Sequence, residues 1–397
     1  MGVNKVIFGA LPIMDISDST VTPETLADGA IAYDATGERI TGTLVAKGDE
    51  YIKPEGTITI YEPGTVDVSQ YKYVLVLAGG LKFVQSNITA SDATCALVGN
   101  GVWVLGADDA AYYSADGKTW TQGNYSNSFE ILHYANGVWV GVDAEYGYLC
   151  YSTDGINWTR GSIAGQASTA NSHSQCLYYV DGLWFSGGSS SRTLYSTDNG
   201  MSWSLCTGMG VSTQCVHYAD GLWVIGDYAG LYYSTDGISW TKSNITSGTI
   251  HCVYYANGTW VAAGANGLYY SSDGKTWTLS GITVEQTKVL YGNGLWVSIS
   301  ANGIITSADG MIWATTDIYG ASWSTKHNAK HLCYINGLWV VFGTKTNQYM
   351  WYSSDGSNWS TVETDFTVSM AYHSNGMLVL GCGSDGVWYS NTMALPA

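Results

Sequence analysis

The chain has 397 residues, of which 46% are hydrophobic and only 12% are charged, and its formal net charge is −17. Such a chain is repelled by phosphate polymers and by anionic membranes, so the composition argues against nucleic acid and membrane surfaces as partners. No apolar run approaches the roughly 18 residues that a membrane-spanning helix needs, and we expect no secretory signal because no long apolar core with a cleavage site opens the sequence.

The first eighty residues differ from the rest, since they contain neither Trp nor Cys. Thr22-Pro23 is typical of a helix start, with Thr as the N-cap and Pro at the first helical position, and Gly29 keeps that helix short. Residues 31–40 predict a hairpin, and residues 56–68 predict a second β-rich stretch.

We therefore predict a small α+β anchoring or oligomerisation module at residues 1–48 and a β-rich linker module at residues 49–80. Modules of this size rarely stand alone, so we expect them to assemble with copies of themselves or to dock into a larger body.

One short pattern, Ser-x-Asp-Gly-x-x-Trp, recurs seven times in the remainder, and its third copy is one residue longer. We call it the box motif. Its Asp is suited to accept backbone N–H groups of its own turn, its Gly to take a conformation that a side chain opposes, and its Trp to fill the space between neighbouring sheets. The seven structural Asp residues of the box motif are Asp116, Asp154, Asp198, Asp236, Asp273, Asp309 and Asp355.

A second marker, Asn/Asp-Gly-x-Trp, runs in phase with the box motif at seven places from Asn100 to Asn336, and an eighth copy at Asn375 has Leu378 in place of Trp. Asn-Gly pairs favour tight hairpin turns, and each unit also contains four short strand-like runs. A repeat near forty residues with four strands per unit is typical of a β-propeller. The sequence therefore predicts an all-β, eight-bladed β-propeller at residues 81–397, with a seven-bladed ring as the alternative.

The eighth unit lacks its own fourth strand, because the chain ends soon after Ser390. Residues 82–89 align with residues 239–246 and share their last four residues, Ser-Asn-Ile-Thr. We therefore expect the segment before blade one to supply the outer strand of the last blade, which removes an exposed sheet edge.

The cysteines do not predict disulfides or a metal site. Four of the eight occupy the same first-strand position in different units, where a small apolar side chain packs, and no Cys-x-x-Cys pair occurs. We expect no metal and no cofactor.

Two resemblances cover almost the whole chain. Residues 20–29 with residues 34–43, and the linker motif at residues 56–69, resemble the N-terminal part of phage and prophage tail and fibre proteins of Gram-positive hosts. The box motifs resemble those of Asp-box (BNR-repeat) propellers, a superfamily that includes sialidases and many non-catalytic modules. Together they imply an anchor followed by a distal adhesion domain, assembled as a homo-oligomer with a trimer as the commonest form.

The sequence gives little support to catalysis. Sialidases resemble this chain in fold but use three arginines on several blades, whereas Arg160 and Arg192 are the only two arginines in the predicted propeller. Other glycosidases need only two carboxylates at a suitable separation. The acidic residues that leave this alternative open are Asp108, Asp109, Asp143, Glu145, Asp227, Asp317, Glu363 and Asp365.

The longest connections indicate where a ligand binds. Residues 159–175 and 314–330 lengthen the connections between blades, and residues 142–148 and 343–350 lengthen those between the second and third strands. All four fall on one face of a propeller, and long loops on a rigid scaffold usually carry binding function. The candidate glycan-binding residues in these loops are Tyr146, Tyr148, Arg160, His173, Tyr319, Trp323, His327 and Tyr349.

These observations favour a non-enzymatic virion protein, made in the host bacterial cytoplasm and exposed on the particle. Residues 1–80 contact other virion proteins, and the propeller binds a host cell-surface polysaccharide. The alternatives are a glycan depolymerase that uses acidic residues of the long-loop face, and a purely structural decoration of the virion.

Overall fold

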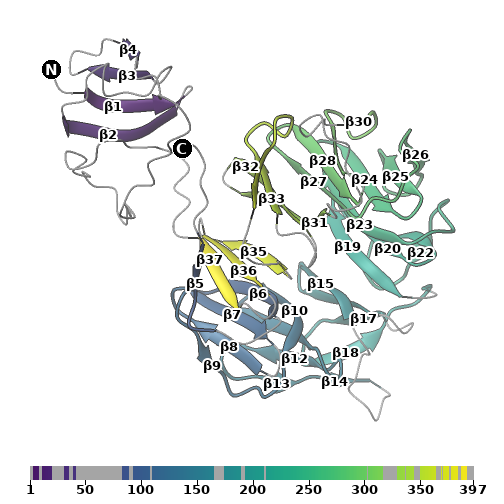
Figure 1. Ribbon diagram of the computed structural model, residues 1–397. Coiled ribbons are helices and arrows are strands. Elements are labelled where there is room, and N and C mark those ends of the chain that lie inside the picture. Colours follow the sequence, from purple (N-terminus) through teal and green to yellow (C-terminus); the bar gives the residue numbers. More distant parts are fainter. Residues whose placement is uncertain are drawn as a thin grey trace. The chain divides into compact units, whose positions relative to one another are not determined.

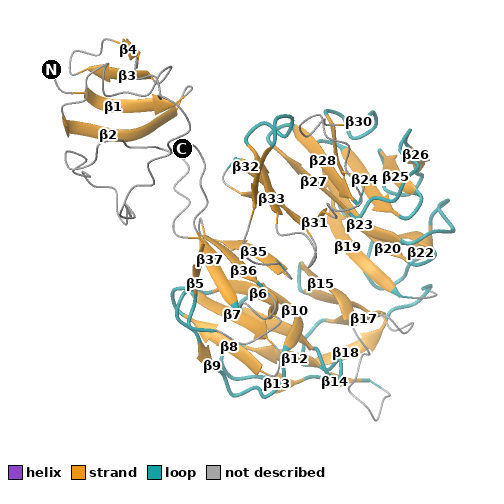
Figure 2. Ribbon diagram, viewed as in Figure 1, coloured by secondary structure: helices purple, strands orange, loops and turns teal. Residues whose placement is uncertain are grey.

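The computed structural model describes four strands within residues 3–41 and most of residues 83–390. The ranges not described in the second part are 89–92, 108–109, 165–173, 189–192, 210–211, 302, 316–328, 336, 344–348, 364–367, 369, 375–376 and 383–385. The chain separates into two compact units, and the second, Phe83–Asn391, contains all the repeats. The described residues contain strands and no helix (Figure 2), so they include no helix long and apolar enough to cross a membrane.

The N-terminal strands form one antiparallel sheet in the order β2-β1-β3-β4. The strands are β1 (Val3–Phe8), β2 (Leu11–Ser19), β3 (Ile31–Asp34) and β4 (Arg39–Thr41). Pairing of β3 with β4 confirms the predicted hairpin. The helix expected after residue 22 and the β-rich stretch at 56–68 lie outside the described residues, and the module boundaries stay predictions.

Eight sheets make up the second unit, which confirms the eight-bladed propeller and rejects the seven-bladed alternative (Figure 1). Blades 1 to 4 contain, in turn, β6 (Ala93–Gly99), β7 (Val102–Ala107), β8 (Ala110–Ser114), β9 (Thr121–Gln122); β10 (Phe129–Ala135), β11 (Val138–Asp143), β12 (Leu149–Ser152), β13 (Thr159–Arg160); β15 (Ser174–Val180), β16 (Leu183–Gly188), β17 (Thr193–Ser196), β18 (Ser202–Leu205); and β19 (Thr213–Ala219), β20 (Leu222–Asp227), β21 (Gly230–Ser234), β22 (Thr241–Lys242).

The other four blades repeat the same order of strands. They contain β23 (Ile250–Ala256), β24 (Thr259–Gly264), β25 (Gly267–Ser271), β26 (Thr278–Leu279); β27 (Lys288–Gly292), β28 (Leu295–Ser300), β29 (Gly303–Ser307), β30 (Ala314–Thr315); β31 (Ala329–Ile335), β32 (Leu338–Gly343), β33 (Tyr349–Ser353), β34 (Ser360–Glu363); and β35 (Met370–Ser374), β36 (Met377–Gly381), β37 (Val387–Ser390) with β5 (Phe83–Gln85).

The ring closes through the strand that precedes blade 1. β5 pairs antiparallel with β37, and Phe83 lies opposite Ser390. The first strand of each blade contacts that of the next blade, and β35 of blade 8 contacts β6 of blade 1. This confirms the closure predicted from residues 82–89, although the strand itself is limited to Phe83–Gln85.

Both recurring turns have the expected geometry. In six of the Asn/Asp-Gly turns, both residues have a positive φ, as at Asn257 (50°) and Gly258 (77°). In the first box motif, the Asp116 carboxylate accepts the N–H groups of Lys118 and Thr119, each at 2.8 Å, and the hydroxyl of Ser114 at 2.9 Å. The other six copies contain the same Ser-to-Asp hydrogen bond at 2.8–3.0 Å.

The core lies between blades. Trp260 and the box residue Trp277 of blade 5 pack against Leu222, Val224 and Leu231 of blade 4. The ring N–H of Trp277 donates to the carbonyl of Gly274, so its one polar group is satisfied within the box turn. Each box Trp thus acts as the interblade wedge that its spacing predicts, and the stacking of blades fixes the ring.

None of the eight cysteines forms a disulfide. Thiols on the first strands instead donate to carbonyls of the next blade, such as Cys95 to Phe129 and Cys252 to Val289. Burial raises the pKa of Cys95 to about 12, so this thiol stays neutral and unreactive at physiological pH.

Candidate functional site

The order of strands divides the loops between two faces. Because the four strands of a blade alternate in direction, the interblade connections and the turns between second and third strands lie on one face, which we call the loop face. The Asn/Asp-Gly turns and the box turns lie on the opposite face, the box face. The chain enters the ring at Phe83 and leaves it after Ser390, and both residues lie at the box face.

A buried carboxylate organises the loop face of blade 2. Asp143 ends β11 and is fully buried (0% exposed). Its Oδ1 atom accepts the N–H groups of Glu145 (3.0 Å) and Tyr146 (2.6 Å), and its Oδ2 atom accepts the hydroxyl of Tyr125 (2.6 Å) and the side-chain amide of Asn127 (2.9 Å). Four donors therefore compensate the buried charge and fix the turn that follows β11.

Sequence reasoning missed the two side chains that support Asp143. Tyr125 and Asn127 lie in the connection between β9 and β10, which is not unusually long. Tyr125 stacks on Phe129 with a ring-centroid distance of 4.9 Å and an interplanar angle of 5°. Burial, the nearby Cys150 and the hydrogen bond to Asp143 raise the pKa of Tyr125, so it stays a donor at physiological pH. The available signal was Asp143 itself, an acid at the end of an apolar strand, which requires partners if it is buried.

Three of the predicted binding residues come together above this support. Tyr146 is 48% exposed, and its ring centroid lies 5.4 Å from that of Tyr148. The guanidinium carbon of Arg160 lies 3.9 Å from the centroid of the Tyr148 ring. Burial alone would lower the pKa of Arg160, but its hydrogen bond to Tyr125 and the neighbouring Tyr148 raise it. The guanidinium group therefore stays protonated.

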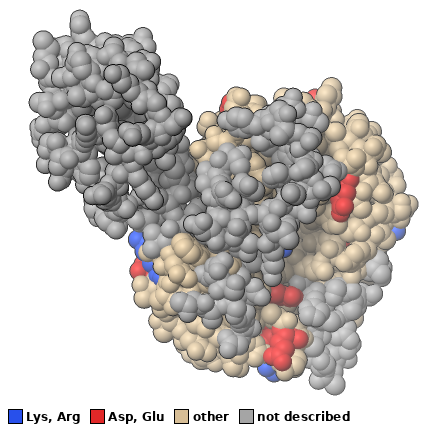
Figure 3. Space-filling view, viewed as in Figure 1, with Lys and Arg blue, Asp and Glu red and all other residues tan. Residues whose placement is uncertain are grey.

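This cluster presents the open ring of Tyr146 and the exposed carboxylate of Glu145 on the turn after β11, and the N–H donors of Arg160 from β13. A hydrogen bond to Glu145 raises the pKa of the Tyr146 hydroxyl, which ties the two exposed side chains together. In the view of Figure 3, acidic atoms gather over β10 and β12 beside a basic side chain. Such a combination of ring face, donors and acceptors suits a polyhydroxylated ligand.

The other predicted site residues are not tested. His173, Tyr319, Trp323 and His327 lie outside the described residues. Tyr349 was expected in a loop but is the first residue of β33, where it pairs with Glu363.

Part of the long connection after blade 2 is a strand rather than a loop. β14 (Ser162–Ile163) runs parallel to β18 and makes blade 3 five-stranded. The N–H of Ser162 donates to Met201 and that of Ala164 to Trp203, and Ile163 is buried. Some of the additional residues in 159–175 therefore cover the outer edge of a neighbouring blade, which an unpaired edge strand favours.

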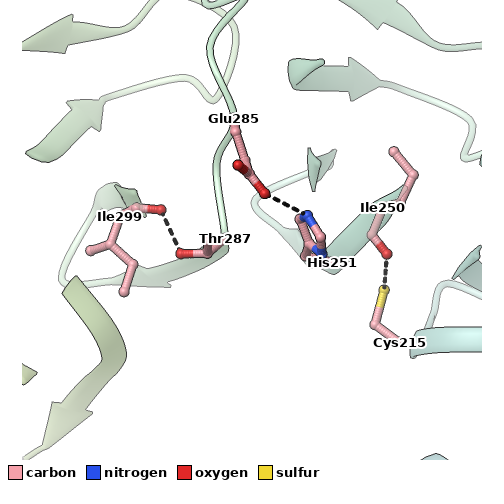
Figure 4. A network of polar contacts seen from close by, with 6 residues as sticks. All are labelled: Cys215, Ile250, His251, Glu285, Thr287 and Ile299. Carbon is pink, nitrogen blue, oxygen red and sulfur yellow. Dashed lines mark hydrogen bonds and ion pairs between the residues drawn. The ribbon is translucent and has the colours of Figure 1, made fainter. Parts of the chain in front are cut away.

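Bulges give the inner strands a polar position that the sequence did not reveal. In six blades the pairing register of the first and second strands shifts at one residue, as between Ile250 and Cys252. That residue is polar in all six: Thr94, Glu130, Gln175, Gln214, His251 and Lys330. In blade 5 the Nε2 atom of His251 lies 3.1 Å from the Glu285 carboxylate, which precedes blade 6 (Figure 4).

Asp108, Asp109, Asp317 and Asp365 lie outside the described residues, so the possibility of a catalytic carboxylate pair is not tested. Asp143 and Asp227 are both fully buried at the ends of second strands, two blades apart. Both carboxylates accept backbone N–H groups of the following turn, as Asp227 does from Ala229 at 2.6 Å. Among the described residues, no group of three His, Cys, Asp or Glu side chains could hold a metal ion.

No family model and no curated protein matches the sequence. Solved structures match in fold. The computationally designed Ika8 protein is 12% identical with a TM-score of 0.62, and the match covers 78% of this chain and 99% of Ika8. The Dos1 propeller is also 12% identical, with a TM-score of 0.58 and coverage of 78% and 95%. BamB from Moraxella catarrhalis is 12% identical, with a TM-score of 0.55 and coverage of 78% and 98%.

At these identities the likeness shows the fold alone. The chain contains an eight-bladed all-β propeller.

Proposed function

We propose that this protein is a fibre- or tail-type adhesion protein of a phage, which binds a host cell-surface polysaccharide through the loop face of its propeller. The observation that carries the proposal is the cluster of Tyr146, Tyr148 and Arg160 on the face opposite the point where the chain enters the ring. The chain continues from residues 1–80 into the ring at Phe83, on the box face, and the proposed receptor site lies on the opposite face of the propeller.

The chemistry of the cluster favours an uncharged or weakly charged glycan. Tyr146 offers a ring face to the C–H groups of a sugar, and Arg160 and Glu145 offer donors and acceptors to its hydroxyl groups. The net charge of −17 opposes a strongly anionic polymer. Because Asp143 holds the turn from below, the site is organised before the ligand binds.

Binding of the full chain to an array of bacterial surface polysaccharides tests this function. We expect Tyr146→Ala to weaken binding by about tenfold or more, which is the effect of losing an exposed anchor residue. The matched control is Ile312→Ser, which changes a side chain that is 79% exposed on the box face and should leave binding unchanged. Equal binding by wild type and Tyr146→Ala, or no capture by any polysaccharide, contradicts the proposal.

Incubation of the captured polysaccharide with the full chain separates adhesion from depolymerisation. We expect no release of reducing ends. The carboxylates of Asp143 and Asp227 support this, because both are buried and engaged by the turns that follow them. Time-dependent release would identify a glycosidase instead.

The virion role has its own test. We propose that residues 1–80 attach the protein to other virion proteins and assemble it as a homo-oligomer, with a trimer as the first expectation. Light scattering of the full chain should then give three times the protomer mass of 42.6 kDa. Immunogold labelling should find the propeller exposed on intact particles, and its absence from purified particles would contradict this role.

A further inference from the structure

Blade 4 repeats the three features that build the site in blade 2. Its second strand ends on Asp227, its next turn carries the exposed Tyr228, and its fourth strand carries the cation Lys242. In blade 2 the matching features are Asp143, Tyr146 and Arg160.

The geometry of blade 4 is also similar. Asp227 is fully buried (0% exposed), and its Oδ1 atom accepts the N–H of Ala229 at 2.6 Å, which fixes the turn. Tyr228 in that turn is 52% exposed. The Nζ atom of Lys242 lies 5.4 Å from the ring centroid of Tyr232, so in both blades a cation covers the face of a tyrosine.

The three features occur together only in these two blades. No other second strand ends on Asp, since blades 5 and 6 end theirs on Gly264 and Ser300. The residue equivalent to Arg160 and Lys242 is uncharged in all other blades: Gln85, Gln122, Leu205, Leu279, Thr315 and Thr361. Packing of the propeller does not explain this coincidence, because six blades fold without any of the three.

One difference makes the copy in blade 4 the simpler of the two. Met209 packs in the interblade cluster where blade 2 has Tyr125, and among the described residues the Oδ2 atom of Asp227 has no hydrogen-bond partner. Burial raises the pKa of Asp227, partly offset by the Ala229 N–H and by Lys242. The turn after Asp227 is also shorter, with one exposed aromatic ring where blade 2 has two neighbouring rings.

We propose that Tyr228 and Lys242 form a second glycan subsite on the loop face, a quarter of a turn around the ring from the site in blade 2. This inference rests on the proposed function and adds that the ligand is a polymer held at two points. Two weak subsites on one rigid ring raise the affinity for a long chain far above that for a single repeat, because the second contact is intramolecular.

The test compares two forms of one probe, namely wall polysaccharide freed of teichoic acid from a panel of Gram-positive strains, intact and cleaved to single repeat units. The full chain carries Tyr146→Ala, Tyr228→Ala or both, with Lys242→Gln as a milder second variant for blade 4. Tyr270→Ala is the control, because this tyrosine lies on the third strand of blade 5, where the three features are absent.

We expect each Tyr→Ala change to lower affinity for the intact polysaccharide by about tenfold or more, through loss of avidity, and to change affinity for the single repeat far less. Lys242→Gln should act in the same direction. Full binding of the intact polysaccharide by Tyr228→Ala and Lys242→Gln, together with a loss in Tyr146→Ala, overturns the second subsite and leaves the proposed function standing. Unchanged binding in all variants overturns both.

Discussion

His133 and His217 occupy equivalent positions on the first strands of blades 2 and 4 and are packed among aromatic rings. The ring of His133 meets Trp184 edge-on at 5.5 Å, and that of His217 meets Trp260 at 5.8 Å. Burial lowers the pKa of each from 6.5 to about 4. The folded chain therefore keeps both rings neutral in a range where the unfolded chain binds protons.

This predicts a fall in stability on mild acidification. The contribution of the two histidines to the free energy of unfolding is fully present above 6.5, their pKa in the unfolded chain. It declines as the pH falls from 6.5 toward 4, by on the order of 1–3 kcal/mol for each ring. Because Tyr178 and Tyr254 stand at the same position in blades 3 and 5, the double variant His133→Tyr, His217→Tyr should lose less stability between about pH 7.5 and about pH 4.5.

Urea unfolding at the two pH values measures the difference. Titration of the box carboxylates does not contribute to this difference in stability. Burial alone would raise the pKa of Asp154, but hydrogen bonds from Asn157, Ile156 and Ser152 lower it to about 2, below this range. An equal loss of stability in wild type and variant would show that other groups control the acid response.

Between elements, an asparagine side chain joins neighbouring blades at three described seams, and at one of them Asn124 accepts the N–H of Trp158 at 3.3 Å. Asn87 accepts the N–H of Trp120 at 2.7 Å and donates to its carbonyl at 2.8 Å, and Asn244 makes the same two bonds with Trp277. The seam between blades 5 and 6 has Gly281 at the equivalent position, in the middle of a Ser-x-Ile turn with the same Ile-to-Ser hydrogen bond. Trp313 of blade 6 is also half-buried, whereas the other six box Trp residues are buried.

Gly281→Asn should therefore stabilise the protein. A Cβ atom at Gly281 meets nothing within 4 Å. The new side chain adds two hydrogen bonds, and replacing Gly makes the unfolded chain less flexible. Together these effects should raise the free energy of unfolding by about 1–3 kcal/mol. The control Gly281→Ala supplies only the backbone part, about 0.4–1 kcal/mol. The midpoint of urea unfolding measures both, and an Asn variant no more stable than the Ala variant would contradict the seam account.

At this scale the sequence predicts well what repeats. The box turns, hairpins and interblade Trp residues follow from local residue chemistry. Each occurs in seven or eight copies, so the pattern can be recognised even where one copy departs from it. Single features were missed because they have no copy to compare. Ser162 and Ile163 joined an edge strand of the next blade, and the support of Asp143 came from Tyr125, 18 residues earlier in the chain. Both depend on contacts across a seam that local pattern does not specify.

For the whole molecule, closure by β5 joins the two ends of the ring. Deletion of residues 82–89 should remove the fourth strand of blade 8 and expose the edge of β37. We expect the single cooperative unfolding transition to be lost, with blade 8 and blade 1 separating first. Calorimetry measures it, and deletion of residues 1–48 in a parallel variant controls for removal of chain elsewhere. An unchanged transition would show that closure does not hold the ring together.

The ring explains why fold and site differ in predictability. Blade number, closure and the division into two faces follow from the period of the repeat and the antiparallel order of strands. The site depends on which individual side chains decorate one face, and only three of the eight predicted residues, Tyr146, Tyr148 and Arg160, are placed together. The sequence did not predict a site in blade 4, because candidate residues were sought in the longest loops and the turn after Asp227 is short.

Hydrogen exchange of the full chain, with and without a bound surface polysaccharide, tests the loop-face account most directly. Slower exchange is predicted at the amides of residues 144–148 and 228–230, with no change in the box turns on the opposite face. Protection confined to the box turns, or spread evenly around the ring, would contradict the account.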